Sequence, residues 1–264
     1  MNLGLDGRTA IVVASSQGIG RATAETLAAE GANVVLCARG EEELERTAAV
    51  IAAAHGDDRV LAVPTDVTSG PAVEALVARA IERFGGVDIL VASTGGPPPT
   101  PFMDVTDEAW SATFDSILLS AARLVRGVVP SMREGGWGRI LFVTSTAAKQ
   151  PLAHLVLSNA TRPGVHGLAK TLSQELGGDG ITVNCVCPGI VKGTRAEQIF
   201  TYRSEHQGIT KAAVQAEIRE AIPLGRVASA QDIANTITFL ASEPAAYITG
   251  TSLSVDGGLC KSTF

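Results

Sequence analysis

The stretch from Thr9 to Gly20 constrains the fold of this chain more than any other. The apolar run Ile11–Ala14, rich in β-branched residues, predicts a strand, and a helical pattern starts at Gly18 after a turn of small residues. A strand, a glycine turn and a helix start in this order bind a dinucleotide pyrophosphate, because free N–H groups of the first helical turn face the anion. The alternative is a plain strand-to-helix turn, since Gly-x-Gly alone is a weak signal. We expect cofactor contacts from Ala14, Ser15, Ser16, Gln17, Gly18, Ile19 and Gly20.

The second predicted strand, Asn33–Ala38, ends at Arg39. Folds that bind NAD carry an acidic residue near this strand end for the ribose 2′-hydroxyl, and that residue is missing here. A guanidinium suits a 2′-phosphate instead. We therefore predict NADP(H) in preference to NAD(H), with Arg39 at the phosphate. The alternative is a solvated arginine at the start of a loop.

Two later strand ends supply further candidates. Asp66 and Val67 follow the strand predicted at Arg59–Val63, and Asp66 could bond the adenine amino group or cap the next helix. The strand predicted at Val87–Ala92 leads into the loop Ser93–Pro101, which three consecutive prolines make stiff and extended. Open α/β sheets bind ligands at the carboxyl ends of strands. We interpret the loop as one wall of an active cleft, the alternative being a rigid surface turn.

Helical and strand patterns alternate along the whole chain. The alternation predicts one α/β domain over residues 1–264, with a parallel sheet, helices on both faces and right-handed crossovers. Helices are predicted at Gly18–Glu30, Glu41–His55, Thr68–Phe84, Thr106–Met132, Ala153–Leu176, Arg195–Ala221 and Ala230–Ala241, and the remaining strands at Arg139–Thr144, Gly180–Cys187 and Ser252–Val255.

Composition narrows the classes of function. The net charge of −6 argues against sequence-independent nucleic-acid binding. No apolar run reaches the about 20 residues of a membrane span, and the N-terminus lacks the layout of a signal peptide. We expect a cytoplasmic protein with a small-molecule substrate that binds neither nucleic acid nor membrane. The spacing of Cys37, Cys185, Cys187 and Cys260 fits free thiols, so no metal site is expected.

Together these motifs resemble the short-chain dehydrogenase/reductase family, and most of all its β-ketoacyl carrier-protein reductase branch. The resemblance extends along nearly the whole chain and implies a single-domain Rossmann fold with seven strands in the order 3-2-1-4-5-6-7, NADP(H) or NAD(H), and a homotetramer. It also implies cofactor contacts at Val67, Ser93, Thr94, Gly95, Pro188, Gly189 and Ile190. A polar helical segment at about residues 193–221 is expected to form a lid, because it covers the substrate in members of the family. The residues that carry it are Ala14, Gly18-Ile19-Gly20, Asp66-Val67, Val87–Val91, Ser145, Gly167–Leu172, Ile181–Asn184, Pro188-Gly189, Pro223–Arg226, Tyr247–Gly250 and Val255–Gly258. The Thr-Gly that opens the family's fingerprint is here Val13-Ala14.

The catalytic positions depart from the family's pattern of asparagine, serine, tyrosine and lysine. Ser145 matches the serine. The tyrosine, thirteen residues later, falls on Ser158, and the lysine, four residues further, falls on Arg162. Gly167 supports the same register, and the asparagine falls on Ile117. The resemblance thus implies Ser145, Ser158 and Arg162 as the catalytic set.

These replacements alter the expected proton chemistry. In the family, the tyrosine hydroxyl exchanges a proton with the carbinol oxygen. A serine hydroxyl is too weak an acid for this without an adjacent base, and an arginine offers charge but no titratable proton. Ser158 and Arg162 would share one helical face, although Pro163 predicts a kink or a helix start at this point. Other polar candidates are Lys149, His154, Asn159, His166 and Tyr202, for which solvated or packing roles are the alternative.

Three functions fit this sequence. The first is an NADP(H)-dependent oxidoreductase that acts on a carbonyl or alcohol substrate through an altered proton relay. The second is a non-redox lyase, isomerase or cyclase that polarises an oxyanion with Ser145, Ser158 and Arg162. The third is a nucleotide-binding or scaffold protein without turnover. We favour the first, because hydride transfer needs mainly a bound and oriented nicotinamide.

Overall fold

The computed structural model describes residues 1–263 and places seven parallel strands in one sheet, in the order β3-β2-β1-β4-β5-β6-β7. This confirms the predicted fold class and strand order. The central strands are continuous apolar runs because helices cover both faces of the sheet. The strands are β1 (Thr9–Val13), β2 (Asn33–Ala38), β3 (Val60–Pro64), β4 (Ile89–Ser93), β5 (Gly138–Val143), β6 (Ile181–Pro188) and β7 (Ser252–Val255).

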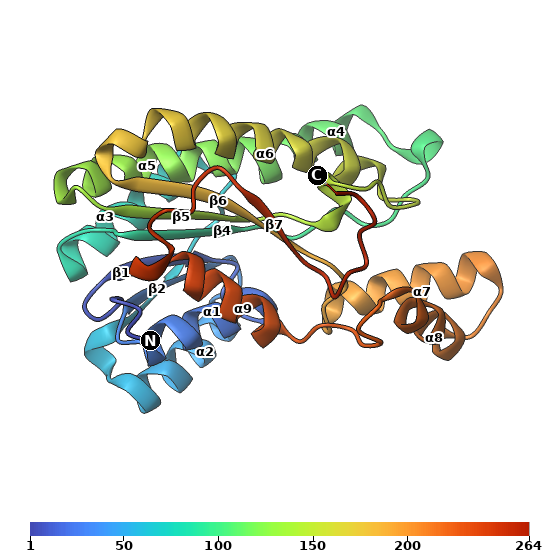
Figure 1. Ribbon diagram of the computed structural model, residues 1–264, viewed down its shortest axis with the longest axis horizontal. Helices are drawn as coiled ribbons and strands as arrows, with labels where there is room; N and C mark the ends of the chain where they lie inside the picture. The colour runs from blue at the N-terminus through green and yellow to red at the C-terminus, as the bar shows by residue number, and fades with distance from the viewer. Residues whose placement is uncertain (264) are drawn as a thin grey trace.

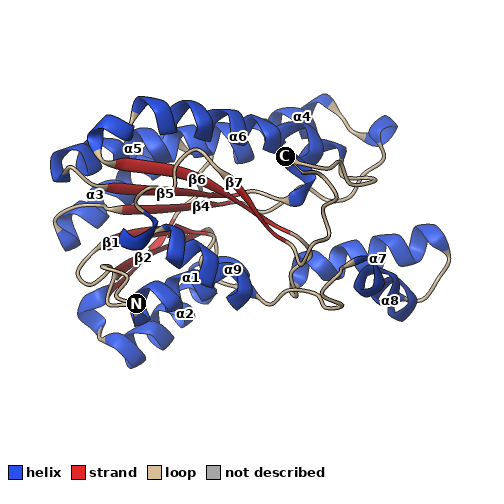
Figure 2. Ribbon diagram, in the orientation of Figure 1, coloured by secondary structure: helices blue, strands red, loops and turns tan. Residues whose placement is uncertain are grey.

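Two layers of helices enclose the sheet (Figures 1 and 2). One face carries α1 (Gly18–Ala29), α2 (Glu41–His55) and α9 (Ala230–Leu240); the other carries α3 (Gly70–Phe84), α4 (Asp107–Phe114), α5 (Ser120–Gly135) and α6 (Val156–Glu175). Side chains of a strand alternate between the faces. Ile11 and Val13 therefore join the cluster under α3, α5 and α6, whereas Ala10 and Val12 join the one under α1, α2 and α9.

The segment expected to form the lid, here called the lid segment, differs from its prediction as one helical segment. It contains two helices, α7 (Thr194–Gln207) and α8 (Lys211–Ala221), within the predicted residues 193–221. Gly208 ends α7 in the left-handed conformation, with φ 65°, and the side chain of Thr210 caps α8. The two helices pack on each other through a small cluster of their own and project beyond the sheet (Figure 1).

Two other helices correct the sequence analysis. The segment predicted as one helix from Thr106 to Met132 contains a π-helical stretch, Asp115–Leu119, between α4 and α5, and it continues to Gly135. Pro163 neither begins nor ends α6, since buried residues on both sides of it hold the helix against the sheet. Tertiary packing here overrides the local preference of proline. Within residues 1–263, no helix is both long and apolar enough to cross a membrane.

Candidate functional site

The turn between β1 and α1 is shaped for close approach of a ligand. Ala14 and Gly18 both adopt left-handed backbone conformations, with φ 56° and 59°. That conformation strains a residue with a Cβ, so Ala14 occupies a position that favours glycine. A Cβ at Gly20 would overlap the carbonyl oxygen of Ala14, so only glycine fits there. The first turn of α1 can therefore pack directly against the end of β1.

Hydrogen bonds to neighbouring elements hold this turn in place. Ser15 exchanges two bonds with Cys37 of β2: its N–H donates to the carbonyl at 3.2 Å, and its Oγ accepts from the N–H at 2.9 Å. The carbonyl of Ser16 accepts from Thr47 Oγ1 at 3.0 Å. Gln17, the N-cap residue, makes no side-chain capping bond. First-turn N–H groups of α1 thus remain available to an anion.

The ends of β2 and β3 place the other predicted adenosine contacts. Arg39 is exposed directly after β2. Asp66 Oδ1 accepts from the N–H and Oγ1 of Thr68, at 3.0 and 2.8 Å. These bonds, and to a smaller extent the charge of Arg39, lower the pKa of Asp66. Asp66 therefore orders the turn before α3, although the N-cap itself is Ser69. Val67 packs, partly buried, against the core under α3.

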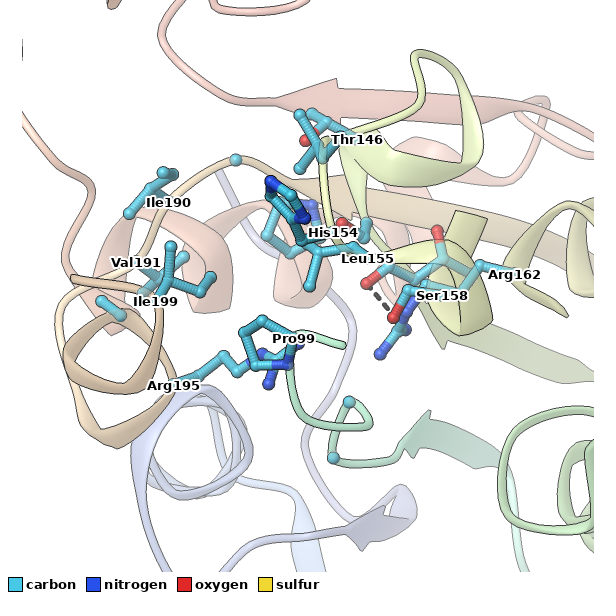
Figure 3. Close-up of a pocket in the computed structure, with 18 of the residues that line it drawn as sticks. Pro99, Thr146, His154, Leu155, Ser158, Arg162, Ile190, Val191, Arg195 and Ile199 are labelled. Atoms are coloured by element: carbon cyan, nitrogen blue, oxygen red, sulfur yellow. Dashed lines mark hydrogen bonds between the residues drawn. The ribbon is translucent and has the colours of Figure 1, made fainter. Parts of the chain in front are cut away.

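A cavity of about 470 Å³ lies at the carboxyl ends of the central strands, between α6 and the lid segment (Figure 3). The proline-rich loop forms part of its wall through Gly95, Gly96 and Pro99, and the loop is tied to His154, whose carbonyl accepts from Thr100 N–H at 2.8 Å. The predicted residues that line the cavity are Ile19, Ser93, Thr94, Gly95, Ser145, Ser158, Arg162, Pro188, Gly189 and Ile190. Those that do not line it are Ala14, Ser15, Ser16, Gln17, Gly18, Gly20, Arg39, Asp66 and Val67.

The residues outside the cavity follow the carboxyl ends of β1, β2 and β3, which continue the same edge of the sheet. A ligand long enough to reach from the cavity to Arg39 would contact both sets. A dinucleotide has this length, and it binds along such an edge where the strand order reverses. Here the reversal lies between β1 and β4.

The three predicted catalytic residues meet at this cavity. Ser145 begins the short 3₁₀ turn after β5, and its Oγ accepts from Ala147 N–H at 3.1 Å. Ser158 and Arg162 lie one turn apart on α6 and are 3% and 6% exposed. Arg162 Nη1 donates to the carbonyl of Thr144 at 3.0 Å, which anchors the guanidinium at the end of β5.

Arg162 keeps its charge at neutral pH. Burial first, and then the positive charge of Arg195, lower the pKa of Arg162 to about 10. The group is therefore a cation near the two serine side chains and not a proton donor in the neutral range.

A second, smaller cavity of about 10 Å³ adjoins Arg162 and is lined by Ile117, Thr94 and Thr144 among others.

Arg195 is a further residue of the cavity, and its sequence context did not predict it. Its guanidinium lies against the backbone of the proline-rich loop at Gly96. The contact is so close that a Cβ at Gly96 would be only 3.2 Å from Nη2 of Arg195. Figure 3 shows it directed from α7 towards Pro99. In the sequence, the one indication was its position shortly after Pro188-Gly189. An arginine in a polar helix is equally consistent with a solvated side chain.

Tyr202 and His154 also line the cavity. The Tyr202 hydroxyl is enclosed and has no hydrogen-bond partner among residues 1–263. Its ring stacks on His206, with centroids 3.8 Å apart, and lies 5.5 Å from the ring of His154. His154 adopts φ 59°, a strained conformation for a residue with a Cβ, and such strain clusters at functional sites.

Two other polar candidates have structural roles. Asn159 clamps Leu152, donating from Nδ2 to its carbonyl at 2.8 Å and accepting from its N–H at 3.1 Å. His166 does not line the cavity itself; its Nε2 lies 3.0 Å from Oγ1 of Thr144, which does. Burial, with the charges of Lys149 and Arg162, lowers the pKa of His166 to about 4. Over the described residues, no cluster of side chains suits a metal ion, and the four cysteines are free thiols.

Comparisons with known proteins agree with this architecture. Residues 13–260 match the family model described as enoyl-(acyl carrier protein) reductase. The chain is 35% identical to a putative ketoacyl reductase of Streptomyces coelicolor over 258 residues, covering 96% of this chain and 97% of that protein. L-Sorbose reductase from Gluconobacter frateurii, solved with NADPH and L-sorbose, superimposes with a TM-score of 0.93 at 36% identity and covers 99% of this chain and 100% of its own.

A second solved structure, from Pseudomonas aeruginosa PAO1, is an NADPH-bound short-chain oxidoreductase containing an atypical catalytic center. Its TM-score is 0.89 at 32% identity, with 98% of this chain and 99% of that chain covered. The family model and the relatives above 30% identity both extend over almost the whole length of the present sequence. The chain therefore belongs to the short-chain dehydrogenase/reductase family.

Proposed function

We propose that this protein is an NADP(H)-dependent oxidoreductase that acts on a carbonyl or alcohol substrate through an atypical catalytic centre. The observation that carries the proposal is the convergence of Ser145, Ser158 and Arg162 on one cavity, at the edge of the sheet that also bears the β1–α1 turn. Membership in the family, and the NADPH bound to its structural neighbours, support the cofactor assignment.

The residues present fit such a cofactor. The uncapped start of α1 offers N–H groups to the diphosphate, and Gly20 admits the close approach that a larger residue would block. Arg39 is exposed where a 2′-phosphate would bind, and Ser93–Gly95 and Pro188–Ile190 line the cavity for the nicotinamide half. When bound, the nicotinamide supplies or accepts the hydride.

We assign Ser158 and Arg162 to the positions where the family carries tyrosine and lysine. The hydroxyls of Ser145 and Ser158 hold the substrate oxygen, and the Arg162 cation stabilises the negative charge that develops there. None of the three is an acid that protonates an alkoxide efficiently at neutral pH, so the proton that completes the alcohol comes from water in the cavity. The helices α7 and α8 form one wall of the cavity and cover the substrate.

The test combines cofactor binding with product analysis. Fluorescence titration should show NADPH binding, and a panel of small ketones, oxo acids and keto sugars should yield one alcohol per NADPH consumed. Ser158→Ala should lower that turnover by about 100-fold, because one oxyanion donor is lost. Thr161→Ala is the matched control, since Thr161 is buried on α6 but does not line the cavity. Substrate conversion at constant NADPH absorbance, or equal effects of the two variants, would contradict the proposal.

A further inference from the structure

The cavity has an excess of positive charge. Arg162, Arg195 and Arg203 all line it, and no aspartate or glutamate does so within the part of the chain that the structure describes. Arg203 has its own counter-charge, since Nη2 lies 2.7 Å from Glu217 Oε2. Among residues 1–263, Arg162 and Arg195 form no ion pair, and both line the cavity.

The contacts of these two arginines are made with neutral groups. Arg195 Nη1 donates to the amide oxygen of Gln198 at 3.3 Å, and Arg162 donates to the carbonyls of Thr144 and Val143. Burial lowers the pKa of both groups, and the charge of Arg195 lowers that of Arg162 further. Two cations in a partly desolvated cavity repel each other, so an anion bound there gains attraction from both.

The two guanidinium groups come from opposite walls. Arg162 belongs to α6 and lies one turn from Ser158, whereas Arg195 belongs to the lid segment and rests against Gly96 (Figure 3). A substrate whose carbonyl oxygen lies at Ser145, Ser158 and Arg162 would extend across the cavity towards Arg195. The planar fork of an arginine matches a carboxylate with two parallel hydrogen bonds.

We propose that the substrate is an oxo acid, or the corresponding hydroxy acid, and that Arg195 binds its carboxylate opposite Arg162. The inference rests on the proposed function, since it names the substrate class of the same site. It makes Arg195 the residue that selects acids over neutral ketones. The diphosphate of the cofactor is another anion that Arg195 could bind. The experiment therefore has one arm for the substrate carboxylate and one for the cofactor.

The first arm compares charged and uncharged ligands of the same shape on the full chain saturated with NADP⁺. Calorimetric titration with acetate, benzoate and phenylacetate, each against its amide, should show at least one acid binding about 10-fold more tightly than its amide. In Arg195→Gln that preference should fall about 10- to 100-fold or vanish. Arg195→Lys, which keeps the charge but not the fork, should retain part of it. Arg203→Gln is the matched control on the same helix and should change it less than about twofold, because Glu217 already compensates Arg203.

The second arm measures NADPH affinity in the same variants, and we expect it to be unchanged in Arg195→Gln. A tenfold loss of NADPH affinity with the preference for acids intact would assign Arg195 to the cofactor and overturn the proposal. Equal binding of every acid and its amide by the unmodified protein would also overturn it, whatever the variants do. Failure of the proposed function is seen separately, as absence of NADPH binding to the unmodified protein.

Discussion

Rebuilding the proton relay of the family is the sharpest test of the catalytic centre. The combined change Ile117→Asn, Ser158→Tyr and Arg162→Lys should raise reduction of a simple β-ketoester such as ethyl acetoacetate. On the proposed assignment of Ser158 and Arg162, no acid is placed to protonate the forming alkoxide, so the unmodified protein should reduce this ester very poorly. General acid catalysis is worth about 10²- to 10⁴-fold, which bounds the gain. Any native activity should fall in the same variant.

The structure leads us to expect a gain in ketoester reduction near the lower end of this range. A tyrosine at position 158 has room, since Ser158 faces the cavity of about 470 Å³, and α6 runs unbroken through Pro163 to keep position 162 one turn away. Ile117 is only 3% exposed, and replacing it with asparagine costs about 2–4 kcal/mol of stability. The adjoining cavity of about 10 Å³ leaves at most one water to satisfy the new amide. We therefore expect a gain of about 100-fold.

The assay follows the loss of NADPH absorbance and quantifies the hydroxyester. The matched control carries Ser158→Phe with the other two changes, which supplies the same bulk without the hydroxyl. Each of the three substitutions alone should raise reduction of the ketoester only slightly, because the groups act as a unit. Thermal melting of each variant separates loss of fold from loss of chemistry.

Two results would refute this reasoning. Equal rates for the tyrosine and phenylalanine combinations would show that the hydroxyl at position 158 is not the acid. Ordinary ketoreductase rates in the unmodified protein would show that the register is wrong or that another group supplies the proton. Tyr202 is then the first suspect, since its enclosed hydroxyl has no partner in the described chain, and Tyr202→Phe would remove the activity.

Three further predictions concern the cofactor, pH and assembly. Arg39→Asp should weaken NADPH binding by about 1–3 kcal/mol through loss of a charge-assisted pair; equal titrated affinities for NADPH and NADH, unchanged in the variant, would contradict this. Because the pKa of His166 is lowered from 6.5 to about 4, its contribution to stability is complete above pH 6.5 and declines as pH falls towards 4. Urea unfolding should therefore show that the free energy of unfolding falls less between neutral pH and about pH 4 in His166→Gln than in the unmodified protein. An identical fall in both would contradict the lowered pKa of His166. The homotetramer, implied by the family resemblance and by apolar helix faces around Leu118–Val129 and Val165–Leu176, should give a light-scattering mass about four times the 27.2 kDa of one chain, whereas a single-chain mass at micromolar concentration would disprove it.

Much of the fold could be predicted because its signals are local. The strand β1, the turn to Gly20 and the start of α1 follow from an apolar run, small residues and helical periodicity over neighbouring positions. The strand order came from the resemblance to a family, and the structure confirms it. The resemblance also supplied cavity residues: Ser93 and Ser145 were assigned from it, and both line the cavity.

The errors arose where packing between distant segments outweighed local preference. Pro163 predicted a helix boundary, yet contacts on both sides keep it inside α6. The π-helical stretch Asp115–Leu119 contains the same kinds of residue as the α-helices on either side of it. The sequence therefore gave no sign of the change in helix type. Gly208 divides the lid segment, although the same polar pattern continues on both sides.

The net charge of the cavity depends on how distant segments pack together. Arg195 and Arg203 are eight residues apart in one polar helix and are equivalent as sequence. The fold brings Glu217 of α8 to Arg203, whereas it sets Arg195 against Gly96 in the cavity that also contains Arg162. The order of residues along the chain was enough to identify the charged side chains and to locate the strands and most of the helices. Which charges are neutralised depends on the distances between segments far apart in the chain, and those distances exist only once the sheet and lid segment have packed.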